Sequence, residues 1–224
     1  MNDVVTPLSK RRPAPRRGDG WQAEKSALTR RAILEAAVGC FVEHGYASTT
    51  TAVIADRAGV SRGAMMHHFP SRQAVLHAVI EFLHQRRLEE YSTVMKGLDI
   101  EGARLTKKAI RASVEGAWQF VNMPTFVAYQ ELQNASRTDP ELSGIMQALE
   151  KDYERHYIDT VKQVFPHWRD LQVLELANDI VQFMMRGMAV SHMTTRKQQR
   201  VRRILDYVAD ELHRLYSGSS RPSV

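Results

Sequence analysis

The segment GVSRGAMMHHF, from Gly59 to Phe69, decides the fold expected for this chain. It places a serine directly after a glycine-valine pair, followed by a short run of small, methionine and histidine side chains. Serine is a preferred N-cap, so Ser61 predicts the start of a short helix. Glycine commonly ends a helix, so the preceding residues predict another one. The pattern therefore indicates two short helices joined by a tight turn.

The residues on either side of this segment predict further helices. Ser26 is expected to cap a first helix that ends at Gly45, and Thr49 or Thr50 to cap a second, short one. Ser71 is expected to cap a long fourth helix. Further stretches with apolar residues at helical spacing lie at 103–121, 125–136, 140–164, 171–192 and 198–216. Since no stretch alternates as a strand does, the sequence predicts an all-α protein.

Composition and charge narrow the class of protein. The chain has 224 residues, of which 43% are hydrophobic, and no apolar run approaches the roughly 18 residues of a membrane span. The N-terminus has no apolar core of a secretory signal, and the single cysteine, Cys40, is expected to be a buried thiol in a reducing compartment. We therefore expect a cytoplasmic protein.

The formal net charge of +6 is concentrated at the N-terminus. Residues 1–31 hold eight basic and three acidic side chains. A basic arm with proline and glycine suits contact with a phosphate backbone, and it equally suits a solubilising disordered leader.

Residues from Thr29 to Arg87 resemble the N-terminal DNA-binding domain of the TetR family of bacterial transcriptional regulators. The matching pieces are RRAILEAAVGCFVEHGYASTT and IADRAGVSRGAMMHHFPSRQAVLHAVIE. The resemblance implies an N-terminal three-helix, helix-turn-helix domain, joined by a long helix to an α-helical domain that binds a ligand and dimerises. It also implies a homodimer that binds a near-palindromic operator in double-stranded DNA, most often as a repressor, and that a small effector releases.

The expected domain boundaries follow from this resemblance. Residues 1–25 form a disordered basic arm, 26–90 the DNA-binding domain with its helix-turn-helix at about 50–69, 91–216 the effector-binding and dimerisation domain, and 217–224 a disordered tail.

The second short helix is the expected DNA-reading element, because in a helix-turn-helix this helix enters the major groove. Arg62 can reach a phosphate or the O6/N7 edge of guanine, and Met65 is expected to face the core while Met66 faces DNA. Ala64, Met66 and His68 depart from the hydroxyl-bearing residues common in the family. The residues expected to contact DNA are Thr50, Thr51, Ser61, Arg62, Gly63, Ala64, Met66, His67, His68 and Arg72.

Other classes of function receive little support from the residues. His67 and His68 project about 100° apart on a helix, so they do not grip one metal ion, and no catalytic motif such as GxSxG or HExxH is present. We therefore expect no enzyme activity, no metal and no cofactor. The alternative that stays open is a ligand-independent architectural DNA-binding protein.

The second half of the chain is rich in aromatic and methionine residues, which suit either a core or an adaptable pocket for an apolar or aromatic effector. The pocket candidates are Trp118, Asn122, Phe126, Tyr129, Gln130, Tyr153 and Met184. Arg186 is interpreted either as a carboxylate ligand or as part of a salt bridge between subunits. The last two helices are expected to pair with those of a second subunit through Leu174, Ala177, Val181, Met188, Val201, Leu205, Val208, Leu212 and Leu215.

Overall fold

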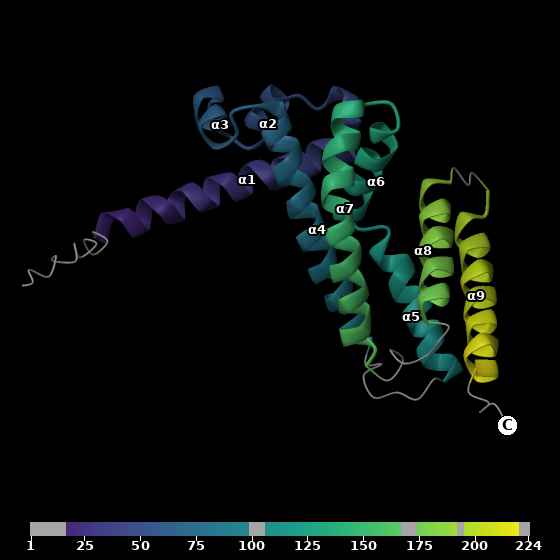
Figure 1. Ribbon diagram of the computed structural model, residues 1–224. Helices are drawn as coiled ribbons and strands as arrows, with labels where there is room; N and C mark the ends of the chain where they lie inside the picture. Colours follow the sequence, from purple (N-terminus) through teal and green to yellow (C-terminus); the bar gives the residue numbers. More distant parts are fainter. Residues whose placement is uncertain (1–16, 99–105, 167–173, 192–194, 220–224) are drawn as a thin grey trace, which may run out of the picture.

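The computed structural model describes residues 17–98, 106–166, 174–191 and 195–219 (Figure 1). Within these ranges the chain forms nine helices and no strand, which confirms the predicted all-α class. The helices are α1 (Arg17–Ser48), α2 (Thr51–Arg57), α3 (Arg62–His68), α4 (Arg72–Lys96), α5 (Lys107–Phe120), α6 (Pro124–Ser136), α7 (Pro140–Val164), α8 (Leu174–Val190) and α9 (Lys197–Ser219).

The first helix begins earlier than the sequence suggested. α1 starts at Arg17, so Ser26 lies inside the helix and does not cap it. Residues 20–28 are exposed, and this part of α1 projects away from the rest of the molecule (Figure 1). Residues before Ser26, among them Gln, Ala, Glu and Lys, favour helix as much as those after it, so the local signal is ambiguous. Of the arm expected to be disordered, residues 17–25 are helical, and residues 1–16 lie outside the described residues.

The three caps of the short helices and the long helix are formed as expected. The hydroxyl oxygens of Thr50, Ser61 and Ser71 accept hydrogen bonds from the backbone N–H three residues later, at 3.2, 3.1 and 3.0 Å. Gly45 kinks α1 shortly before its end, and Gly59 follows the end of α2. Their φ values are 73° and 66°, a region that favours glycine. These caps fix where α2, α3 and α4 begin.

A first hydrophobic core joins α1, α2, α3 and the first half of α4 to parts of α6 and α7. Ala128, Tyr129 and Leu132 from α6 and Leu142 and Ile145 from α7 are buried in it. The helices of the expected DNA-binding domain therefore do not form a separate core, because residues far beyond the expected boundary at residue 90 complete it.

A second core lies between the ends of α4 and α7 and the three helices α5, α8 and α9. Helices α5, α8 and α9 lie side by side at one edge of the molecule (Figure 1). In the described part of the chain, none of the helices combines the length and hydrophobicity that crossing a membrane requires.

A buried aromatic and polar cluster occupies the junction between the two cores. His84 stacks on Tyr153, with ring centroids 4.4 Å apart, and its Nε2 atom lies 3.8 Å from a carboxylate oxygen of Glu150. Burial, and secondly the positive charge of Arg87, lower the pKa of His84 to about 4. Since this pKa lies well below 7, His84 is neutral at pH 7.

This burial predicts acid sensitivity. Unfolded histidine has a pKa near 6.5, so below that pH the unfolded chain binds a proton that the folded chain does not. Because of His84, we expect the free energy of unfolding to decrease by up to about 3 kcal/mol as the pH falls from 7 to 4. Urea denaturation at both pH values should show this loss in the wild type and a smaller one in His84→Phe. His77→Phe, which changes an exposed histidine of the same helix, should retain the wild-type loss; equal losses in all three proteins would contradict the assignment.

Candidate functional site

The α2–α3 unit presents a short exposed helix at one end of the molecule (Figure 1). Met65 is buried, with 2% exposure, and Met66 is 52% exposed, as the sequence predicted. Arg62 lies at the first turn of α3, next to the capping Ser61, and both are exposed. Of the other residues expected to contact DNA, Thr50, Gly63, His67 and Arg72 are exposed, and Thr51, Ala64 and His68 are partly buried.

The position of α2 is set by a pair of charges. Arg57 donates two hydrogen bonds to the carboxylate of Glu43 on α1, at 2.7 and 2.6 Å. The guanidinium lies over Gly39, where a Cβ atom would come within 2.6 Å of it. A larger residue at this place on α1 would require the Arg57 guanidinium to shift from its present position. Cys40, next to it, is buried, and burial raises the pKa of its thiol.

Tyr46, near the end of α1, connects this helix to α6 and α7. Its hydroxyl donates to Asp139 at 2.6 Å, and its backbone N–H donates to Glu131 at 2.8 Å. The guanidinium of Arg72 lies over its ring, 4.9 Å from the centroid. These contacts join the end of α1 and the start of α4 to α6 and to the start of α7.

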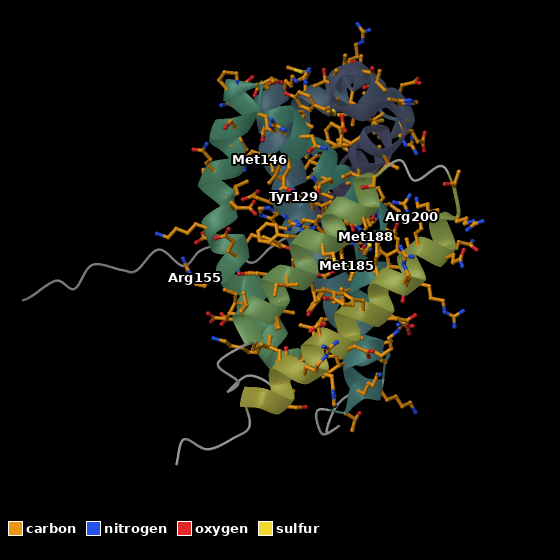
Figure 2. The ribbon with its side chains drawn as sticks, turned by 90° about the vertical axis from the view of Figure 1, so that its right-hand side faces the viewer. Tyr129, Met146, Arg155, Met185, Met188 and Arg200 are labelled. Carbon is orange, nitrogen blue, oxygen red and sulfur yellow. The ribbon has the colours of Figure 1, made fainter. Side chains whose placement is uncertain are left out.

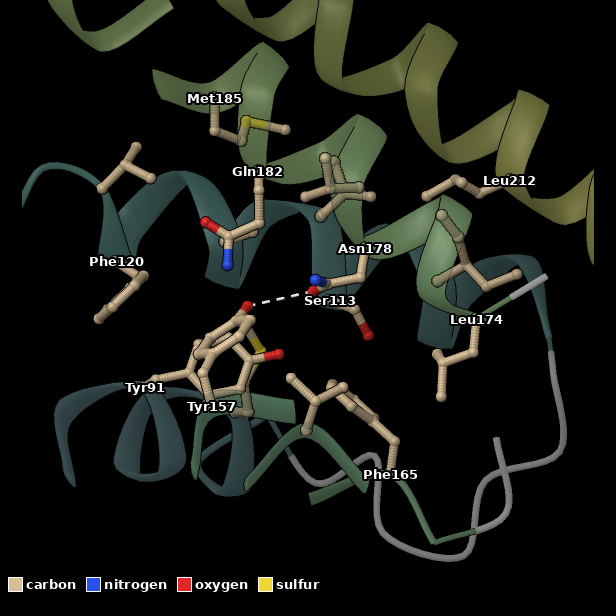
Figure 3. Close-up of a pocket in the computed structure, with 18 of the residues that line it drawn as sticks. Tyr91, Ser113, Phe120, Tyr157, Phe165, Leu174, Asn178, Gln182, Met185 and Leu212 are labelled. Carbon is tan, nitrogen blue, oxygen red and sulfur yellow. Dashed lines mark hydrogen bonds between the residues drawn. The ribbon is translucent and has the colours of Figure 1, made fainter. Parts of the chain in front are cut away.

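An apolar cavity lies between α4, α5, α7, α8 and α9 (Figure 3). The empty space among its walls, including the part open to solvent, is about 640 Å³. Its lining includes Tyr91, Phe120, Tyr157, Leu174, Met185 and Leu212. The apolar character of this lining suits a small, largely apolar molecule.

The described lining of the cavity has a few polar groups and no charged residue. The Tyr157 hydroxyl donates to Asn178 at 3.1 Å (Figure 3), and Gln182 and Ser113 line the same space. Burial raises the pKa of Tyr157 well above its ordinary value, so this phenol stays neutral. These groups can orient a ligand by hydrogen bonds without supplying charge.

None of the seven residues expected to form the effector pocket lines this cavity. Phe126, Tyr129 and Tyr153 surround the buried side chain of Arg87, and Gln130 lines a separate hollow beside α6. The three others lie elsewhere: Trp118 packs against the second core, Asn122 is exposed, and Met184 lines a surface hollow between α8 and α9. Helical spacing shows that such residues share a face, but the neighbouring helices decide which faces enclose space.

Most of the residues expected to form the dimer contact are buried inside the single subunit instead. Seven of the nine are buried in a single subunit, and Val181 and Leu215 are partly buried. α8 carries a second apolar stripe on its outer face, formed by Leu176, Ile180, Phe183 and Val190. Figure 2 views this side of the molecule. Both stripes follow helical spacing, so the sequence could not tell the inner stripe from the outer one.

Among the described residues, no three histidine, cysteine or acidic side chains come together as a metal site would require.

The exposed α3, the glycine-containing turn before it and the three-helix packing beneath it define a helix-turn-helix DNA-binding domain. Residues 33–79 match the family described as "Bacterial regulatory proteins, tetR family". The chain carries the DNA-binding domain of this family.

Comparisons with individual proteins agree. The chain is 32% identical over 132 residues to the HTH-type transcriptional regulator CymR of Pseudomonas putida, covering 58% of this chain and 63% of that protein. It is 32% identical over 96 residues to the HTH-type transcriptional repressor AcnR of Corynebacterium efficiens, covering 41% and 51%. The matches thus span less than two thirds of these relatives.

The fold extends beyond the matched domain. A solved structure described as a TetR-family transcriptional regulator from Mesorhizobium loti superimposes with a TM-score of 0.65 at 17% identity, covering 86% of this chain and 98% of that one. This likeness concerns the fold, and it includes the α-helical second half.

Proposed function

We propose that the protein is a ligand-responsive transcriptional regulator, acting as a repressor, that binds a near-palindromic operator as a homodimer. The observation that carries the proposal is the exposed α3, capped by Ser61 and led by Arg62, in a domain that matches the tetR family. Regulators of this family bind DNA, usually form dimers and bind small effectors. The name of AcnR supports repression, since that relative is a transcriptional repressor.

The first turn of α3 is suited to DNA. A helix N-terminus offers free backbone N–H groups to a phosphate, and Arg62 can pair with a phosphate or with the edge of a guanine. Gly63 and Ala64 are small, which lets the helix approach the groove closely. The exposed thioether of Met66 suits contact with thymine methyl groups.

The outer apolar stripe of α8 is the surface we propose for dimerisation. Leu176, Ile180, Phe183 and Val190 recur at spacings of three, four and seven residues, and Gly187 lies between the last two with open space around its Cα. On α9, Tyr207 is 61% exposed. Pairing α8 and α9 with the same helices of a second subunit would bury this stripe in a four-helix bundle and place the two α3 helices about one DNA turn, or a multiple, apart.

The apolar cavity is the proposed effector site. Tyr91 and Met95 of α4 line it, and α4 begins at Arg72 in the DNA-binding domain. A ligand that fits better when the two DNA-binding domains are spread apart would shift the dimer away from the spacing that DNA requires.

Footprinting tests this function. The full-length protein should protect a short, near-palindromic site in the DNA flanking its own coding region, in the presence of excess unrelated DNA. A small apolar effector should remove the protection. Protection that unrelated DNA competes away equally well would favour the alternative, an architectural DNA-binding protein. Absence of any protection, on this DNA or on selected random sequences, would contradict DNA-binding function.

Removal of the basic arm tests its role in DNA affinity. Residues 1–20 hold five basic and two acidic side chains. Each phosphate contact contributes about 0.9 to the slope of log affinity against log salt concentration, so we expect the truncated protein to show a flatter slope. Titrations of operator DNA at 50–200 mM salt measure it, and a chain lacking residues 220–224 is the control. An unchanged slope would identify the arm as a solubilising leader.

A further inference from the structure

Arg87, on α4, is a buried cation with two nitrogen atoms that lack acceptors among the described residues. Its exposure is 1%, and its Nε and Nη1 atoms have no hydrogen-bond partner among the described residues. Its guanidinium carbon lies 3.9, 4.6 and 5.1 Å from the ring centroids of Tyr129, Tyr153 and Phe126. The rings interact with the charge through their faces, but the N–H groups lie in the guanidinium plane and require acceptors there. The acceptor that fits an arginine fork best is a carboxylate or a phosphate.

A second arginine approaches the same aromatic rings from α8. The guanidinium carbon of Arg186 lies 5.6 Å from the centroid of Phe126, and its Nε atom is also buried without a hydrogen-bond partner in the part of the chain that is described. Burial raises the pKa of Tyr153, while the charges of Arg87 and Arg186 both act to lower it, which places both cations close to this ring. Two positive charges from different helices therefore converge on Phe126 and Tyr153.

Two carboxylates bonded to residues of this region are engaged with other groups. Glu150 accepts a hydrogen bond from the Tyr129 hydroxyl, and Glu90 accepts one from Thr125. Within the described ranges, no carboxylate oxygen lies within 4.0 Å of a guanidinium nitrogen of either buried arginine. The charges of Arg87 and Arg186 both act on the Tyr153 ring, and so does the charge of Glu150. An added anion that pairs with the two guanidinium groups would supply acceptors for their unpaired N–H groups.

The arginine pair lies one aromatic layer from the apolar cavity. Phe120 and Tyr157 line the cavity (Figure 3), and each is a neighbour of one of the rings around Arg87. The Phe120 and Phe126 centroids are 5.4 Å apart, and those of Tyr157 and Tyr153 are 6.1 Å apart. Met185, which also lines the cavity, directly precedes Arg186. A ligand in the cavity would therefore need only a movement of these side chains to reach the two guanidinium groups.

We propose that Arg87 and Arg186 bind the carboxylate of an effector whose apolar body occupies the neighbouring cavity. The effector is then an aromatic or aliphatic carboxylic acid, and the pair is its charge-recognition site. The inference rests on the proposed ligand-binding function and adds the chemical class of the ligand. It also gives a physical link between the ligand and DNA, because the carboxylate would join α8 to α4, the helix that begins in the DNA-binding domain.

The test is a direct binding measurement on the full-length protein without DNA. Titration calorimetry compares benzoate, phenylacetate and octanoate with benzamide, phenylacetamide and octanamide, which have similar shapes but no charge. We expect at least one acid to bind at least about tenfold more tightly than its amide, as a charge-assisted hydrogen-bonded pair would provide. Equal affinities for every acid and its amide, or no binding of any acid, would overturn the proposal.

The same titrations on substituted proteins test which residues recognise the carboxylate. Arg186→Gln and Arg87→Met should each remove the preference for the acid, while Arg155→Gln, which changes an exposed arginine of α7, should retain it (Figure 2). Should Arg87→Met fail to fold, Arg186→Gln still decides the matter, because it replaces a partly buried side chain. A preference that persists in Arg186→Gln would overturn the assignment.

The two proposals fail separately in this design. If the protein binds an acid through the arginine pair but protects no operator, the ligand assignment holds and the regulatory function fails. If it protects an operator but binds acids and amides equally, the regulatory function holds and the carboxylate site fails.

Discussion

Phe183→Asp should convert the protein from a dimer into a monomer and abolish its tight binding to the operator. Phe183 is 71% exposed in the single chain and lies in the middle of the outer stripe of α8. In a two-fold symmetric interface the substitution acts twice, and each copy would lose a buried aromatic ring and would bury a carboxylate. At about 2 kcal/mol or more for each lost ring, the dimer should weaken by about a thousandfold or more.

Sedimentation velocity over a range of concentrations measures the dimer, and a mobility-shift titration measures the operator affinity. Ile158→Asp is the matched control, because Ile158 is an exposed aliphatic residue on α7, outside the proposed interface. It should dimerise and bind DNA as the wild type does. A dimeric Phe183→Asp protein would show that another surface holds the subunits together.

Arg62→Ala should weaken operator binding strongly while leaving the dimer and its helical content intact. Arg62 is exposed at the first turn of α3 and makes no ion pair with any described residue, so its removal costs the free protein little. A bidentate contact to guanine contributes about 1–3 kcal/mol, and the dimer has two copies. The expected loss is therefore about 2–6 kcal/mol, which is at least about thirtyfold in affinity.

Measuring the affinity of the variant for both operator and unrelated DNA shows whether Arg62 contacts a base or a phosphate. If Arg62 contacts a base, the variant should lose more affinity for the operator than for unrelated DNA; if it contacts a phosphate, it should lose both about equally. Arg155→Ala, which changes an exposed arginine on α7, should bind as the wild type does. Unchanged operator affinity in Arg62→Ala would show that α3 is not docked in the way proposed.

Short-range sequence patterns were sufficient to predict the structure around the helix-turn-helix. The caps at Ser61 and Ser71 and the glycine turn at Gly59 are interactions within a few residues, so they are legible in one sequence. The assignment of Met65 to the core and Met66 to the surface also follows from helical spacing alone. The start of α1 was missed because Ser26 has the chemistry of a cap in a segment where helix-forming residues continue on both sides.

The residues of the proposed ligand site could not be predicted in this way. Phe126, Tyr129 and Tyr153 were expected to line the effector pocket, but none of them lines the apolar cavity. They enclose Arg87, which no sequence pattern connected to them. The cavity instead uses residues of five helices, among them Tyr91 near the end of α4 and Tyr216 near the end of α9. Their approach depends on helix packing between segments more than a hundred residues apart.

The amino-acid sequence by itself determined the all-α class, the helix boundaries to within a few residues at most termini, and the family of the DNA-binding domain. Those features depend on hydrogen bonds and side-chain spacing within single helices and turns. Tertiary structure alone decided which of the two apolar stripes of α8 faces inward, which side chains enclose the cavity, and that two arginines from α4 and α8 meet beside Phe126. A helix has the same periodicity on every face, so only its neighbours determine which face is buried.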